Sequence, residues 1–234
     1  YGIDLADLVS AELDLVPAMP PRDAGLDASM IAAYGQDDRL GAFAALRALL
    51  DAKRPEYTTL VYLADNEESG NNNNTGAGSS YLVDLIERLL YGQRGASYRS
   101  PMLAQALRKS RALSIDVNPG INPIWPSAWE ATNAPRLGYG VNIKLYGRGF
   151  DANSEYIAWT RAYLDAGSIP WQTATYKVGR AGGGTLGREF ARYNMDVIDF
   201  GVPVLSIHTP YALSAKVDVH ALYRAAGAFI TAAQ

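Results

Sequence analysis

Cysteine is absent from this sequence of 234 residues, and histidine occurs only twice. Without cysteine the chain can form no disulfide, no thiolate metal site and no cysteine nucleophile. With two histidines, any metal centre must draw most of its ligands from Asp and Glu. No apolar run is long enough to cross a bilayer, and residues 1–4 do not open a signal peptide, so we expect no membrane partner.

A large excess of one charge is also missing, because 21 Lys and Arg residues stand against 24 Asp and Glu residues, for a net charge of -3. This near-balance gives no electrostatic reason to expect a nucleic-acid partner. Apolar residues make up 48% of the chain and charged residues 19%, which is ordinary for a globular protein. We expect a cytoplasmic protein.

The first residue is Tyr1 rather than Met, and residues 3–9 already read as ordered structure. We therefore expect the chain to be a processed or truncated part of a longer polypeptide. Residues 1–35 are richer in Asp and Pro than the rest and read as the tail of a preceding module.

Helical and strand patterns alternate along the rest of the chain. Apolar spacing predicts helices over residues 38–53, 79–90, 154–164, 186–193 and 217–230. Short apolar or alternating runs predict strands over residues 59–64, 112–115, 139–146, 171–177, 195–198 and 202–207. This alternation predicts an α/β fold with a mostly parallel central sheet covered by helices.

Three of these strands run into acidic or imidazole side chains. Glu67 and Glu68 follow the first, Asp116 follows the second, and the last runs into His208. The carboxyl ends of parallel strands meet at one edge of a sheet, so we expect these side chains to converge there. Asp37, at the start of a predicted helix, can join them.

Each of these residues alone has an ordinary structural explanation, such as a helix cap, a solvated loop or a buried imidazole. Together, however, the carboxylates would repel one another unless a cation lies among them. Two divalent metals bridged by a carboxylate form a hydrolase site. Neighbouring Glu67 and Glu68 point to opposite sides of an extended chain, so one can bind metal while the other handles a water proton.

Four motifs and a glycine loop occur in one order along the chain. The segments are YGQDDR at 34–39, DNEE at 65–68, SIDVN at 114–118, GGGT at 182–185 and PVLSIH at 203–208. Together they resemble the aspartyl aminopeptidase family of cytosolic dinuclear-zinc exopeptidases. The similarity extends from Leu8 to about Ile230 and implies a zinc-exopeptidase-like three-layer architecture.

The resemblance implies two divalent metal ions, with zinc expected and cobalt or manganese also tolerated. Asp37 would bridge the two ions, Glu68 and His208 would complete one of them, and Asp116 would bind the other. Glu67 would be the general base that activates the bridging water and later protonates the leaving amine.

The resemblance also assigns three residues around the metals. Gly184 and Thr185 would line the substrate, because glycine lets a peptide approach the backbone closely. Asp65 would not bind a metal itself but would orient a neighbouring metal ligand.

Two departures from the family pattern stand out. The family takes one more ligand from a histidine in an earlier segment, and no histidine precedes His208 here. Many relatives carry Glu where this chain has Ala212. The family also has a dimerisation domain between the early histidine and the bridging Asp. We therefore expect residues 1–35 to be a remnant of that module and residues 36–234 to be the metallopeptidase catalytic domain.

The expected function is a metal-dependent aminopeptidase that hydrolyses the N-terminal peptide bond of peptides through a metal-bound hydroxide. Family precedent suggests acidic N-terminal residues, with Lys177 or Arg180 as the countercharge. The alternative is an incomplete or non-catalytic subunit that needs a separate N-terminal segment for activity or serves in assembly. A related carboxypeptidase or deacylase fits the motif spacing less well. Expected partners are a peptide substrate and either further copies of the chain or a complementary N-terminal chain.

Overall fold

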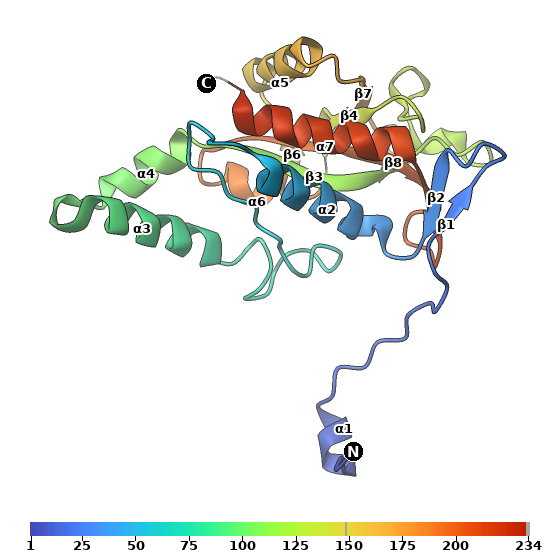
Figure 1. The fold of residues 1–234 in the computed structure, drawn as a ribbon, viewed down its shortest axis with the longest axis horizontal. Coiled ribbons are helices and arrows are strands. Elements are labelled where there is room, and N and C mark those ends of the chain that lie inside the picture. The colour runs from blue at the N-terminus through green and yellow to red at the C-terminus, as the bar shows by residue number, and fades with distance from the viewer. Residues whose placement is uncertain (148, 233–234) are drawn as a thin grey trace.

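The computed structural model describes residues 1–147 and 149–232 and shows a central sheet between two layers of helices (Figure 1). This confirms the predicted α/β class. Within the described part of the chain, the main sheet has seven strands: β1 (Arg22–Ala24), β2 (Met30–Ala33), β3 (Arg111–Pro119), β4 (Val141–Lys144), β7 (Trp171–Ala174), β8 (Asp196–Leu205) and β9 (Ala212–Ala215). The two-residue strands β5 (Tyr146–Gly147) and β6 (Phe150–Asp151) pair separately.

The longest strand, β8, lies inside the sheet and pairs with β3 on one edge and with β4 and β9 on the other. The β3–β8 ladder is parallel and runs from Arg111 opposite Asp196 to Pro119 opposite Val204. The β4–β7 pair is also parallel, while the other described pairs of this sheet are antiparallel. The sheet is therefore mixed rather than mostly parallel as expected, with parallel pairing along the β3–β8 ladder and between β4 and β7.

Helices cover both faces of the sheet. They are α2 (Gln36–Asp51), α3 (Tyr81–Arg94), α4 (Pro101–Arg108), α5 (Ser154–Ala166), α6 (Gly187–Ala191) and α7 (Lys216–Thr231). Alternate side chains of β8 point to opposite faces. Ile198 and Phe200 are fully buried in the core shared with α2, α5 and α7, whereas Val197 packs with residues of α3, α4 and α6. Burial of each large side chain contributes roughly 1.5–3 kcal/mol.

Local signals explain where two of these helices begin. The side chain of Asn153 caps α5 by accepting a hydrogen bond of 2.7 Å from the backbone N–H of Tyr156. Helix α4, which the apolar spacing did not predict, begins at Pro101, in the first turn, where the missing N–H of proline costs no hydrogen bond.

Two strand predictions differ from the structure. Residues 59–64 belong to no strand in the described part of the chain, so that prediction is wrong. The two strands expected over 195–198 and 202–207 are one strand, β8, because the β3 ladder continues through Gly201 opposite Asp116. Beyond Leu205 the chain turns, with a positive φ of 59° at Ser206.

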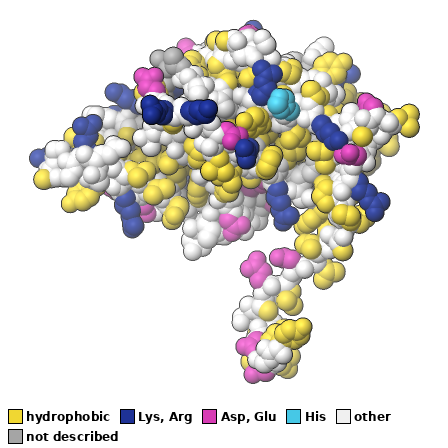
Figure 2. Space-filling model, in the orientation of Figure 1, with side chains coloured by type: hydrophobic (Ala, Val, Ile, Leu, Met, Phe, Trp, Pro, Cys, Tyr) yellow, Lys and Arg dark blue, Asp and Glu magenta, His cyan; other side chains and the backbone are white. Residues whose placement is uncertain are grey.

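Residues 1–21 form an arm that projects from the body (Figure 1). It contains the short helix α1 (Leu5–Val9), capped by Asp4, and it exposes Leu13 and Leu15. Figure 2 shows hydrophobic side chains along this arm. The following strands β1 and β2 join the main sheet through β9. The boundary between residues 35 and 36 stays a prediction. None of the described helices combines the length and apolarity needed to span a membrane.

Gly201 is a position where β8 leaves no room for a side chain next to β3, because a Cβ atom there would overlap the carbonyl oxygen of Asp116. We predict that Gly201→Ala lowers the free energy of unfolding by about 2–4 kcal/mol. Urea denaturation followed by circular dichroism measures this change. The matched control is Gly227→Ala in α7, where a Cβ meets nothing within 4 Å and should stabilise the helix by up to about 1 kcal/mol. Equal effects of the two substitutions would contradict the close approach.

Candidate metal centre

The candidate site lies where the start of α2 meets the carboxyl end of β3. Helix α2 packs so closely on β3 that a Cβ atom on Gly41 would lie 3.0 Å from Cγ2 of Ile115. This approach brings the carboxyl groups of Asp37 and Asp38, at the start of the helix, to that of Asp116 in the strand. Residue type at position 41 therefore helps to set the geometry of the site.

Asp37, Glu68 and His208 form a first group of possible metal ligands. Nε2 of His208 lies 3.1 Å from Oδ2 of Asp37 and 3.3 Å from Oε2 of Glu68. His208 stands in the turn after β8 with a positive φ of 57°, and its side chain is 63% exposed. The structure thus brings together three of the four ligands expected from the sequence, with the imidazole open to incoming ions.

Asp116, the fourth expected ligand, belongs to a second group with Asp37 and Asp38, and a third group contains Asp38, Glu67 and Glu68. In each group the ligand atoms lie within 4.8 Å of one another. Asp37 is shared by the first two groups, as a bridging ligand would be. Asp38 was not expected as a ligand, because adjacent Asp residues at a helix start give no sequence signal of which one is buried.

Two buried charges near Asp116 are not predicted by the sequence. Lys144, at the end of β4, is 3% exposed, and its Nζ donates a hydrogen bond of 3.3 Å to Oδ2 of Asp116. Asp199, in β8, is 1% exposed and accepts hydrogen bonds from the backbone N–H groups of Thr185 and Gly187. The one indication in the sequence is that Lys144 lies in an otherwise apolar strand. A lysine at such a position is equally typical of a side chain that faces solvent.

Burial and like charges perturb the carboxyl groups. Burial, reinforced by Asp116, raises the pKa of Asp37 to about 8 and that of Asp38 to about 10. Burial, with the charges of Asp116 and Glu68, raises the pKa of Glu67 to about 7. Burial also opposes ionisation of Asp116, but the charge of Lys144 and hydrogen bonds bring its pKa below the ordinary value. At neutral pH, when no cation is bound, protons on Asp37 and Asp38 would therefore reduce the repulsion among these carboxyl groups.

These residues fit divalent metal ions. Oxygen ligands with one imidazole suit zinc, cobalt or manganese. Oδ1 of Asp38 is buried and has no hydrogen-bond partner among the described residues, so it is available to a cation. An ion would replace the protons that the raised pKa values require.

The remaining expected site residues have different surroundings. Thr185 is 8% exposed, and its side chain slightly offsets the rise in the pKa of Glu67. Gly184 precedes it in the loop between β7 and α6, next to Gly147. Asp65 accepts hydrogen bonds from Oγ1 of Thr75 and Nδ2 of Asn66 and so holds the loop that carries Glu67. The roles expected for these three residues stay predictions.

Comparisons with known proteins point to one family. The family described as "Aminopeptidase I zinc metalloprotease (M18)" matches residues 1–230. A protein of Thermotoga neapolitana named "Probable M18 family aminopeptidase 1" is 40% identical over 232 residues, which are 96% of this chain and 51% of that protein. The chain spans about half the length of the curated relatives it matches.

Comparison with solved structures indicates the same family. The crystal structure of an M18 aminopeptidase from Thermotoga maritima has a TM-score of 0.93 and 39% identity, over 99% of this chain and 52% of that one. Aminopeptidase I from Clostridium acetobutylicum has a TM-score of 0.90 and 38% identity, over 99% and 51%. The zinc-exopeptidase-like architecture expected from the sequence is therefore confirmed.

Zinc affinity should fall as pH is lowered from about 9 to about 6, because zinc must displace protons from carboxyl groups whose pKa values are raised. In the metal-free protein Asp37 has a pKa of about 8, so this range protonates it. Competition against a chromophoric zinc chelator at several pH values measures the affinity. The control, Asp37→Asn, should bind zinc more weakly at pH 9 and with a shallower pH dependence. An affinity independent of pH would contradict the prediction.

Proposed function

Because the chain belongs to the M18 family of aminopeptidase I zinc metalloproteases, we propose that its polypeptide is a metal-dependent aminopeptidase that releases N-terminal residues from peptides. The observation that carries the proposal is the sharing of Asp37 between two groups of metal ligands. A ligand common to two groups is what a pair of neighbouring ions requires. The activity is a proposal because the chain covers about half of each relative.

In this proposal two ions, with zinc preferred, are held by the residues of the two groups. Asp37 would bridge them, Glu68 and His208 would complete the first ion, and Asp116 would bind the second. Bound divalent ions would polarise the substrate carbonyl and lower the pKa of a water molecule. Asp38 and Lys144 would set the charge around Asp116.

Glu67 would move the proton. Its pKa of about 7 in the metal-free protein lies near neutral pH, where a group can both accept a proton from water and return it to the leaving amine. Asp65 would not touch the metals or the substrate but would hold the loop that carries Glu67 through its hydrogen bonds with Asn66 and Thr75.

The substrate would be a peptide with a free amino terminus, which the carboxylates attract. Gly184 and Thr185 would line its backbone. We include a preference for acidic N-terminal residues in the proposal, with the exposed Lys177 or Arg180 as the countercharge.

The alternative proposal is an incomplete or non-catalytic subunit that needs a separate N-terminal segment. One observation favours it: the group that contains Asp116 has only aspartates, and no histidine precedes His208. A metal bound by Asp37 and Asp116 alone would be weakly held. Under this proposal residues 1–35 are the remnant of a dimerisation module and residues 36–234 the catalytic domain.

Self-association or a complementary chain is part of either proposal, because the arm exposes Leu13, Leu15 and Val16. The relative mApe1 of Saccharomyces cerevisiae has been solved as a dodecamer. We propose a cytoplasmic location on the family resemblance alone.

We predict that Glu67→Gln abolishes hydrolysis of aminoacyl-anilides by the zinc-loaded protein, with a loss of about 100-fold or more, because the variant cannot accept the proton of the attacking water. A panel of anilides that includes Asp, Glu, Leu and Lys derivatives also tests the acidic preference. Glu155→Gln, at the exposed start of α5, is the matched control and should keep full activity. Equal activity of Glu67→Gln and the wild type would contradict the role of Glu67.

The same assay distinguishes the two proposals. Activity of the 234-residue chain with zinc would show that no further segment is required. Folded, zinc-loaded protein without activity would favour the alternative, in which case adding the missing half of the polypeptide should restore hydrolysis.

A further inference from the structure

The buried lysine beside the candidate metal centre reaches its partner across a whole strand. In the sheet register Lys144 of β4 lies opposite Asp199 of β8. Asp116 of β3 lies opposite Gly201, two residues further along β8. Residues directly opposite each other point to the same face of a sheet. Nζ of Lys144 donates its hydrogen bond of 3.3 Å to Asp116, on the far side of β8. The lysine can cross there because Gly201 places no side chain in its path.

Asp199 is a second carboxylate that faces Lys144. Burial disfavours the charged form of Lys144, but the charges of Asp116 and Asp199 outweigh burial and hold the pKa of Lys144 above its ordinary value. The ammonium group therefore stands between two anions. Asp116 is a possible metal ligand, whereas Asp199 belongs to none of the groups of possible ligands found among the described residues.

The carboxyl group of Asp199 is held in place by backbone on two sides. It accepts hydrogen bonds of 3.4 Å and 3.2 Å from the backbone N–H groups of Thr185 and Gly187. A Cβ atom on Gly187 would lie 2.5 Å from its Oδ1, and one on Gly147 would lie 3.2 Å from its Oδ2. A rearrangement of charge in this region must therefore move the lysine rather than Asp199.

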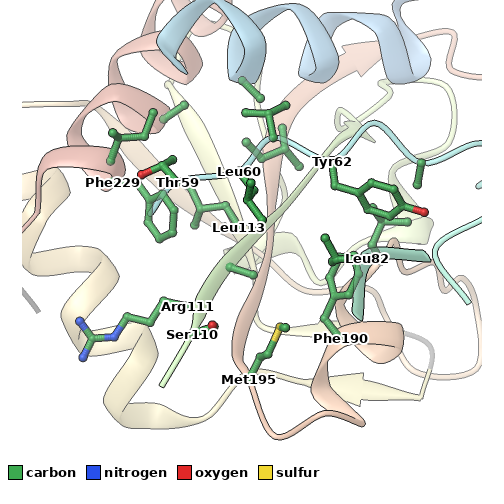
Figure 3. Close-up of a pocket in the computed structure, with 18 of the residues that line it drawn as sticks. Thr59, Leu60, Tyr62, Leu82, Ser110, Arg111, Leu113, Phe190, Met195 and Phe229 are labelled. Carbon is green, nitrogen blue, oxygen red and sulfur yellow. The ribbon is translucent and has the colours of Figure 1, made fainter. Parts of the chain in front are cut away.

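Solvent has little access to Lys144 and Asp199. A cavity of about 560 Å³ lies beside β3, between Leu113 of that strand and Thr59 and Leu60 (Figure 3). The cavity reaches the metal centre, but neither Lys144 nor Asp199 is among the residues that line it. Compensation of the ammonium charge must come from protein groups, because a buried charge without a partner is strongly destabilising.

We propose that Asp199 is a positioning residue of the metal centre: it becomes the main counter-ion of Lys144 when a divalent ion binds Asp116, and so limits the repulsion between the ammonium group and that ion. In the metal-free chain Asp116 itself compensates the lysine. An ion on Asp116 would neutralise that carboxylate, and the lysine would turn toward Asp199, its neighbour in the register. The inference rests on the metal ion that the proposed function places at Asp116.

A simpler role for Asp199 is to anchor the loop that contains Thr185 and Gly187. The two roles predict different effects of a substitution. Loss of a loop anchor would destabilise the chain to a similar extent with and without metal. Loss of a counter-ion would weaken binding of the ion, and only while Lys144 is present. Zinc affinity in a double-mutant cycle separates these two roles.

The test measures zinc binding by the whole 234-residue chain. The wild type is compared with Asp199→Asn, Lys144→Met and the combination of both. Isothermal titration calorimetry and competition with chelators of graded affinity give the number of ions and the dissociation constant of each. The matched control is Asp218→Asn, because Asp218 is also a buried carboxylate that accepts two backbone hydrogen bonds, and it belongs to no group of possible ligands in the described part of the chain. Circular dichroism of each variant checks folding.

We expect Asp199→Asn to weaken binding of the more weakly held ion about tenfold or more, because Lys144 then stays on Asp116 or repels the ion. In the Lys144→Met background the same substitution should change this affinity by less than about threefold. Asp218→Asn should leave it unchanged.

A crystal structure of the zinc-loaded wild type adds a measurement that needs no variant. In it, Nζ of Lys144 should lie within hydrogen-bond distance of Asp199 and no longer within that distance of Asp116. Hydrolysis is not measured in either experiment, so an inactive protein would leave the result unaffected.

Three outcomes would overturn the inference. Asp199→Asn could bind both ions as tightly as the wild type. The loss of affinity could be equal with and without Lys144, in which case Asp199 is a loop anchor only. Nζ of Lys144 could remain bonded to Asp116 in the zinc-loaded crystal, which decides the matter even if the variants fail to fold. In all three cases a wild type that binds two ions leaves the proposed function intact. A wild type that binds one ion at most would contradict the pair of ions in the proposed function, and this inference with it.

Discussion

At the carboxyl end of β3, the carboxyl group of Asp116 shares a small buried volume with those of Asp37 and Asp38 and with the ammonium group of Lys144. Like charges this close cannot all be ionised without a compensating cation. Lys144 compensates Asp116, and raised pKa values keep protons on Asp37 and Asp38. The close approach of α2 to β3 at Gly41 and of β8 to β3 at Gly201 maintains this arrangement, so the packing of the sheet and the charge of the site depend on each other.

The sequence predicted the longer elements well because their patterns reflect burial on one helix face or along one strand. Helices α2, α5 and α7 lie close to their expected ranges. Strands β1, β2 and β9 escaped prediction because three or four residues carry too little periodicity. Residues 59–64 have the composition of a strand, but a strand exists only when a neighbour accepts its hydrogen bonds, and composition does not report the neighbour.

Strand ends account for only part of the candidate site, because His208 follows β8, whereas Asp116 lies inside β3 and the residues before Glu68 form no strand in the described part of the chain. Glu68 and His208 come together with Asp37 as expected, and Asp116 comes together with the same Asp37. Lys144 was not predictable, because burial of a lysine depends on which elements cover β4, and that is a property of the tertiary structure. The sequence also does not predict that Asp38 lies among the possible metal ligands beside Asp37. That placement results from the packing of α2 on β3, which is again a property of the tertiary structure.

The protonated carboxyl cluster also bears on the fate of a chain that has not yet met its metal. Groups whose pKa is higher in the folded chain than in the unfolded chain support the fold below their unfolded pKa and lose that contribution as pH rises through the folded pKa. For Glu67, Asp37 and Asp38 this loss extends from about pH 4 through values of about 7, 8 and 10. At neutral pH a metal-free chain therefore opens more often than a loaded one. Proteases that act on open chains would remove it first, so the lifetime of the polypeptide would follow the supply of metal.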